Sequence, residues 1–73
     1  MSIMQDPLEL AEEVAGLRLS PKADRRLQEL MNRNNNGQLT ETERVDLEAL
    51  AEMSENISLL RAKALLLLGR KPT

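Results

Sequence analysis

A polar stretch in the middle of the chain, residues 32–43, has side chains that could bind calcium. Aligned with the twelve-residue loop of an EF-hand, it places asparagine at loop positions 1, 3 and 5, glycine at position 6 and glutamate at position 12. The only carboxylates of this loop are Glu41 and Glu43, and the sequence has no second loop to pair with it, so we expect weak affinity. The candidate calcium ligands are Asn32, Asn34, Asn36, Gln38 and Glu43.

The same stretch also fits the signals that end one helix and begin the next. Asparagine and glycine tolerate the left-handed conformation found at helix ends, which residues 34–37 supply. Thr40 followed three residues later by Glu43 forms a capping box for a new helix. We favour this interpretation because it accounts for every residue of the stretch. Calcium binding stays as the alternative.

A second set of candidates is a basic cluster around residues 18–33. A short turn containing Gly16 joins two predicted helices here, as in a helix-turn-helix DNA reader. The helix before the turn is strongly acidic, however, and the formal net charge of −2 gives no bulk attraction to nucleic acid. We therefore expect these bases to pair with acids or solvent, and DNA binding is a further alternative. The candidate DNA contacts are Arg18, Lys22, Arg25, Arg26 and Arg33.

The amino-acid composition gives little support for catalytic activity. The chain has no histidine, no cysteine and no aromatic residue, and its three glycines are too far apart for a phosphate-binding loop. We expect no enzyme activity and no cofactor other than the calcium alternative.

The N-terminus lacks the pattern of a signal peptide, and the longest apolar run, residues 64–68, is too short to cross a bilayer. A cytoplasmic protein without a membrane partner is expected.

The periodicity and the capping residues predict an all-α fold in one small domain, residues 1–73. Asp6, Ser20 and Thr40 are the expected N-caps. Two short helices, at about 7–15 and 21–33, are expected to pack on one long helix at about 41–68. Gly16 fits the position just past the first helix. Residues 1–5 and 70–73 are expected to be disordered.

The long predicted helix carries a heptad-like apolar seam. Further leucines outside the seam make its last turns apolar nearly all round, and two short helices cannot cover that surface. A chain of 73 residues without disulfides or zinc ligands buries little surface, so another chain is the expected source of stability. We predict a homo-oligomeric helical bundle. The seam residues are Leu50, Met53, Ile57, Leu60, Ala64 and Leu67.

Two segments carry a resemblance to a group of small bacterial helical proteins. They are residues 17–31, from Leu17 to Met31, and residues 58–69, from Ser58 to Gly69, with residues 36–40 between them. Some members of that group are antitoxin-like and are associated with nucleases. The resemblance covers residues 17–69 and implies a partner protein such as a nuclease, but it transfers no functional residue. The leading hypothesis is a non-enzymatic interaction module, an antitoxin-like inhibitor or adaptor that associates with itself through its long helix.

Overall fold

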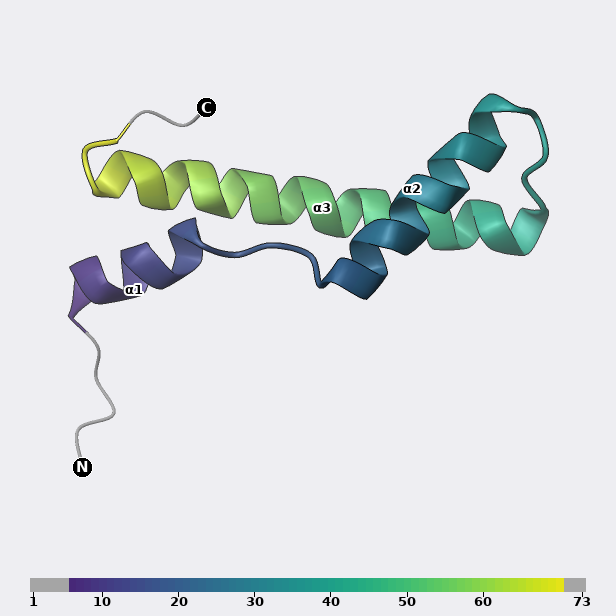
Figure 1. Ribbon diagram of the computed structural model, residues 1–73. Coiled ribbons are helices and arrows are strands. Elements are labelled where there is room, and N and C mark those ends of the chain that lie inside the picture. The colour runs from purple at the N-terminus through teal and green to yellow at the C-terminus, as the bar shows by residue number, and fades with distance from the viewer. Residues whose placement is uncertain (1–5, 71–73) are drawn as a thin grey trace. The chain divides into compact units, whose positions relative to one another are not determined.

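The computed structural model describes residues 6–70, and in this range the chain is all-helical (Figure 1). The helices are α1 (Pro7–Ala15), α2 (Pro21–Asn35) and α3 (Glu41–Leu67), and the described range contains no strand. The prediction that the chain is all-α is confirmed. Residues 1–5 and 71–73, which we expected to be disordered, lie outside the described range. Arg70 lies within it and forms an ion pair with Glu12.

The three predicted N-caps are all present. The Asp6 carboxylate accepts a hydrogen bond from the Leu8 N–H at 3.0 Å, and Ser20 Oγ accepts one from the Ala23 N–H at 3.1 Å. Both helices then begin with proline, whose missing N–H costs nothing in the first turn. Thr40 Oγ1 caps α3 in the same way.

The ends of the helices depart slightly from expectation. α2 continues through Asn35, two residues beyond the predicted end at residue 33, because the left-handed residue that stops it is Gly37 (φ 68°) and not an asparagine. Gln38 N–H donates to the Arg33 carbonyl at 2.9 Å and Gly37 N–H donates to the Asn34 carbonyl at 3.1 Å, which together form a Schellman motif. At the end of α1, Gly16 has a right-handed φ of −92°, so this glycine is not required by its backbone conformation.

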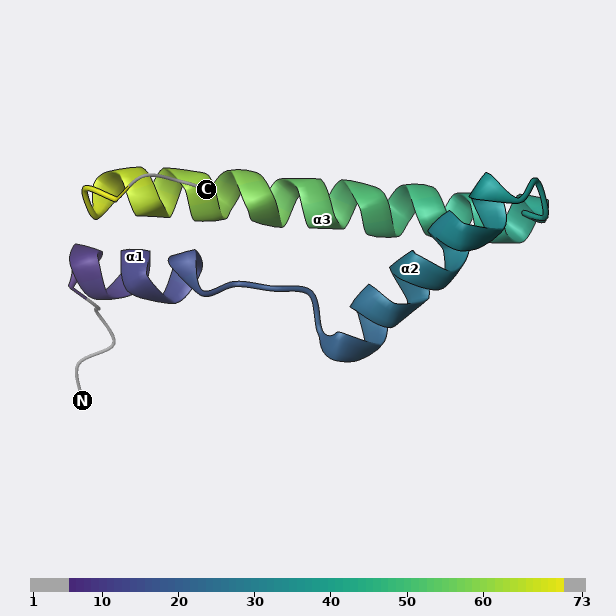
Figure 2. The same cartoon turned by 45° about the horizontal axis from the view of Figure 1, so that its top comes forward.

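The described residues divide into two compact units, and α3 contributes to both. The central unit is Leu19–Glu55 and contains α2 with the first part of α3. α2 crosses this part of α3 obliquely (Figures 1 and 2). Its apolar face buries Leu27 and Leu30, and Leu30 is 0% exposed, whereas Leu47 and Leu50 of α3 are half-buried. The core of the central unit is therefore centred on Leu30.

The terminal unit combines residues 6–18 with residues 56–70. α1 lies beside the last part of α3 and runs antiparallel to it in both views (Figures 1 and 2). The buried residues of this unit are two alanines, Ala11 of α1 and Ala64 of α3. Small side chains at these positions allow the two helices to approach closely. The Arg70 guanidinium joins the end of α3 to Glu12 of α1, with Nη2 and Oε1 2.8 Å apart.

Candidate interaction surface

The segment 32–43 folds as a helix end followed by a helix start. Asn32 and Asn34 lie within α2, and Asn36 is its C-terminal cap. Two helical residues two positions apart point to different faces, so Asn32 and Asn34 do not converge on one cation. Gln38 follows the glycine turn, and Glu43 lies in the first turn of α3. Within residues 6–70 no group of three or more carboxylates gathers around a common point. This geometry fits the helix-end interpretation better than an EF-hand loop.

Glu43 has a structural role that uses both of its carboxylate oxygens. Oε1 accepts a hydrogen bond from the Thr40 N–H at 3.1 Å, and the Thr40 hydroxyl accepts one from the Glu43 N–H at 3.1 Å, which completes the predicted capping box. Oε2 pairs with the Arg33 guanidinium, so the end of α2 is tied to the start of α3. A calcium ion at Glu43 would have to displace both of these interactions.

The environment of Glu43 lowers the pKa of its carboxyl from the usual value of 4.5. The main cause is the hydrogen bond from the Thr40 backbone, and the Thr40 side chain and the charges of Arg33 and Arg26 act in the same direction, against some desolvation. A lowered pKa in the folded state means that folding favours the ionised carboxylate. The resulting stabilisation is present above the unfolded pKa and is lost as the pH falls through the folded pKa.

The variant Glu43→Gln should therefore remove part of the acid sensitivity of the protein. The amide can still accept the Thr40 hydrogen bond but carries no charge to attract Arg33. We expect the wild type to melt at a higher temperature near neutral pH, and we expect this difference to narrow as the pH falls from about 6 to about 3. Thermal melts followed by circular dichroism measure it. Glu41→Gln removes an acid from the same helical turn without changing the cap and is the matched control. A difference that is constant with pH would contradict the assigned role of Glu43.

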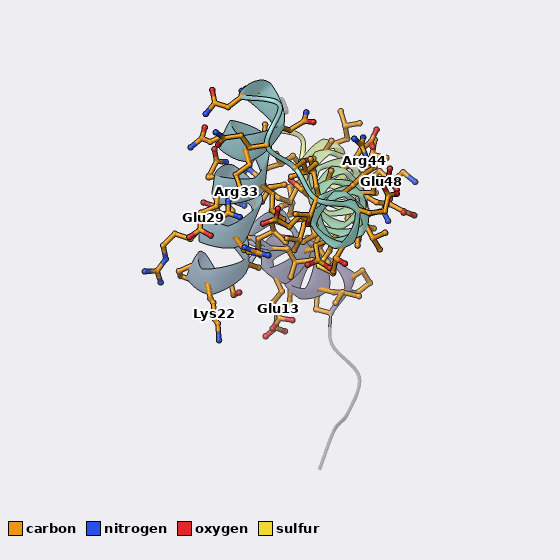
Figure 3. The ribbon with its side chains drawn as sticks, turned by 90° about the vertical axis from the view of Figure 1, so that its right-hand side faces the viewer. Glu13, Lys22, Glu29, Arg33, Arg44 and Glu48 are labelled. Carbon is orange, nitrogen blue, oxygen red and sulfur yellow. The ribbon has the colours of Figure 1, made fainter. Side chains whose placement is uncertain are left out.

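The basic residues do not form one uniform cationic surface. Arg26 contacts Asp46 of α3 at 3.7 Å and Glu29 at 3.5 Å, and Arg33 is paired with Glu43. Arg18 belongs to the terminal unit, where its Nη1 donates to the Leu17 carbonyl at 2.7 Å. Lys22 extends from the start of α2 (Figure 3), and with Arg25, Arg26 and Glu29 it lines a shallow hollow. Acids therefore offset two of the four cations on α2, which does not favour binding to a phosphate backbone.

The outer side of α3 in the central unit carries mixed charges. Arg44 and Glu48 project from the side of α3 that faces away from α2 (Figure 3). Val45 in the same unit is 59% exposed. Apolar side chains scattered among charges are normal on a protein surface, so this side alone does not define a site.

The predicted seam on α3 separates into two columns. Leu50 and Ile57 are half-buried and Ala64 is buried, so these three residues, spaced by seven, face the chain's own helices. The other three, also spaced by seven, are exposed: Met53 by 50%, Leu60 by 48% and Leu67 by 75%. The first column is used inside the units, and the second is open for contact with another molecule.

The terminal unit has an apolar groove where the open column runs beside α1. Leu10 of α1 is 49% exposed, and the volume of the groove is about 300 Å³. The seam predicted on α3 includes Leu60, Ala64 and Leu67 but not Lys63. The role of α1 was not predicted either, although the spacing of Leu10 and Val14 gives this helix an apolar stripe. The floor of this terminal groove is formed by Ala11 and Ala64. Its α1 wall is formed by Pro7, Leu10 and Val14, and its α3 wall is formed by Leu60, Lys63 and Leu67.

Comparisons with known protein families, with curated proteins and with solved structures find no match to this chain. The resemblance to small bacterial helical proteins therefore stays a prediction. In the described part of the chain, no helix combines the length and the apolar composition that crossing a membrane requires.

Proposed function

We propose that this chain is a non-enzymatic protein-interaction module that associates with itself through α3. The observation that supports the proposal is the exposure of large apolar side chains on the last turns of this helix. Leu59 and Leu60 are 57% and 48% exposed, and Leu66 and Leu67 are 65% and 75% exposed. Four leucines within nine residues form an apolar surface that a free monomer would leave in water.

The limited core of the chain supports the same proposal. Among the described residues, four hydrophobic residues are buried and ten large ones are exposed. Full burial of a leucine stabilises a protein by about 1.5–3 kcal/mol. Burying the exposed leucines would therefore stabilise the protein by more than its small core does. No cysteine or histidine is present to supply a disulfide or a zinc site instead. Contact with another polypeptide is the remaining way to bury this surface.

The proposed role is that of a cytoplasmic inhibitor or adaptor for a partner enzyme such as a nuclease. A small helical module can bind such a partner by placing an apolar helix face in a groove of the enzyme. Methionine adapts its shape readily, so the exposed Met53 suits a contact surface. The proposal assigns no catalytic residue and no cofactor to this chain.

Sedimentation equilibrium of the intact chain tests self-association. We expect the mean mass to exceed that of one 8.2 kDa chain and to rise with concentration between about 1 and 100 µM, the range in which interfaces of moderate affinity form. Affinity purification of the tagged chain from its native cells, followed by native mass spectrometry, tests for a stoichiometric partner. A strictly monomeric chain that recovers no partner would overturn the proposed function.

A further inference from the structure

The geometry of the terminal unit points to one occupant for the terminal groove, a second copy of this chain. The inference rests on the proposed function and names the surface through which the chain associates with itself. Two copies of the terminal unit stack groove to groove, so that α1 of each copy lies on the α3 wall of the other. The product is a four-helix bundle of two α1 segments and two α3 segments.

The two walls of the terminal groove match each other in length. The α1 wall runs from Pro7 to Val14 and the α3 wall from Leu60 to Leu67, so the two ends of each wall are seven residues apart, about 10 Å along the helix. Both walls place side chains at spacings of three and four, the pattern that fits the holes of a facing helix, although Lys63 is the middle residue of the α3 wall. A surface built from two walls of equal length and spacing can match a second copy of itself across a two-fold axis.

The charges of the terminal unit select the direction of this two-fold axis. From Asp6 to Ala15 the charged residues are all acids, and from Asn56 to Arg70 they are all bases. A two-fold axis perpendicular to the helices would place α1 of one copy on α1 of the other, so that acidic side chains would face acidic side chains. An axis parallel to the helices places the acidic α1 on the basic end of the partner's α3, twice in each dimer. Opposite charges across an interface favour the second arrangement, and like charges disfavour the first.

Lys63 is the residue that the proposed dimer uses most directly. Its side chain lines the groove among apolar residues, and within residues 6–70 it forms no ion pair. In the proposed arrangement its stem covers apolar surface and its ammonium group reaches the acidic α1 of the second copy. The neighbouring helices of the bundle all run antiparallel, because α1 and α3 are already antiparallel within one copy (Figure 2).

Dimer formation also accounts for the stability of α1. This helix has nine residues, too few to persist alone in water, and it buries only Ala11 within its own chain. Leu10, which is 49% exposed, becomes covered only when the second copy arrives. Docking of α1 and association of the two chains are therefore one coupled event, and dilution releases α1.

Two double variants on neighbouring faces of α3 test the groove. Leu60→Gln with Leu67→Gln changes the α3 wall. Leu59→Gln with Leu66→Gln changes two leucines one position earlier, which are also exposed but do not line the groove. Glutamine keeps a high helix propensity. We expect the first pair to raise the dimer dissociation constant about a hundredfold or more, as for central interface residues, and the second to change it less than about threefold. Lys63→Glu should raise it about tenfold, and Lys63→Gln should raise it less.

Cross-linking between copies of otherwise unchanged chains tests the arrangement independently of folding defects. Since the sequence has no cysteine, Leu10→Cys and Leu67→Cys each introduce a single thiol. When an isotopically labelled Leu10→Cys chain is mixed with an unlabelled Leu67→Cys chain, a short bis-maleimide linker should join them preferentially, because α1 of one copy lies on α3 of the other. Preferential linkage of Leu10→Cys to itself would overturn the inferred axis.

The outcomes separate this inference from the proposed function. A wild-type chain that is monomeric at every concentration overturns self-association itself. A wild-type dimer that is disrupted by the Leu59 and Leu66 changes, and not by the Leu60 and Leu67 changes, keeps self-association but overturns the groove-to-groove dimer. Hydrogen exchange of the α1 amides provides a further readout. Their protection should increase with protein concentration, and protection that is independent of concentration would contradict the coupling of α1 docking to association.

Discussion

Replacement of Leu30 by alanine is expected to unfold much of the central unit at room temperature. Leu30 is fully buried, and truncation of a buried leucine costs about 2–5 kcal/mol through lost transfer free energy and the cavity that remains. A single core in a chain of this size supplies about 3–5 kcal/mol. The cost is therefore comparable to the whole stability available. Urea unfolding followed by far-UV circular dichroism measures the effect as a lower midpoint and a reduced signal without denaturant.

Met31→Ala is the matched control for Leu30→Ala. Met31 is the next residue of α2, but it is 44% exposed. Its truncation leaves no sealed cavity, and we expect a loss of less than about 1 kcal/mol. Equal losses for the two variants would show that Leu30 is not the centre of the core. The comparison also controls for helix propensity, since both variants place alanine in the same helix.

The helix boundaries could be predicted from the sequence because local interactions decide them. Ser20 and Thr40 cap their helices through hydrogen bonds to residues three positions later, and any chain with these residues can form them. The end of α2 was less predictable, because a run of three asparagines and a glycine offers several places to stop. The helix uses the glycine for the left-handed turn, and this allows residues 34 and 35 to stay helical.

The distribution of burial could not be predicted from periodicity. Leu27, Leu30 and Met31 fit the same amphipathic pattern, yet they are 6%, 0% and 44% exposed. The pattern shows that a helix face is apolar, but the direction from which the other helix approaches decides which edge of that face is buried. The same limit applies to the heptad seam on α3, where one column is covered and the other is open.

Contacts between residues far apart in the sequence were the other missing part of the candidate site. Arg33 pairs with Glu43 across the turn between α2 and α3, and Arg70 reaches back to Glu12. No local spacing rule connects such residues. These pairs matter to the functional interpretation, because an arginine bound to a carboxylate is less available to a phosphate. The terminal groove also depends on a contact between distant segments, so α3 alone could not reveal its α1 wall.

Ala64→Leu is expected to have the second large effect, by forcing α1 away from α3. Ala64 is 3% exposed and lies opposite a helix whose buried residue, Ala11, is also small. Enlarging a side chain in a well-packed contact costs about 1–3 kcal/mol, and here no flexible side chain lies at the floor of the groove to give way. Ala51→Leu adds the same atoms to an exposed position of α3 and should change stability by less than about 0.5 kcal/mol.

The response of α1 distinguishes a local effect of Ala64→Leu from a general loss of folding. The central unit has its own buried residues, Leu27 and Leu30, and does not contain position 64. Hydrogen exchange should therefore show that the amides of α1 lose protection while those of α2 keep it. Unchanged protection of α1 would mean that the contact at Ala64 has room for a leucine. Loss of protection in both helices would mean that the two units unfold together, and that the small contact between Ala11 and Ala64 helps to hold the entire described fold.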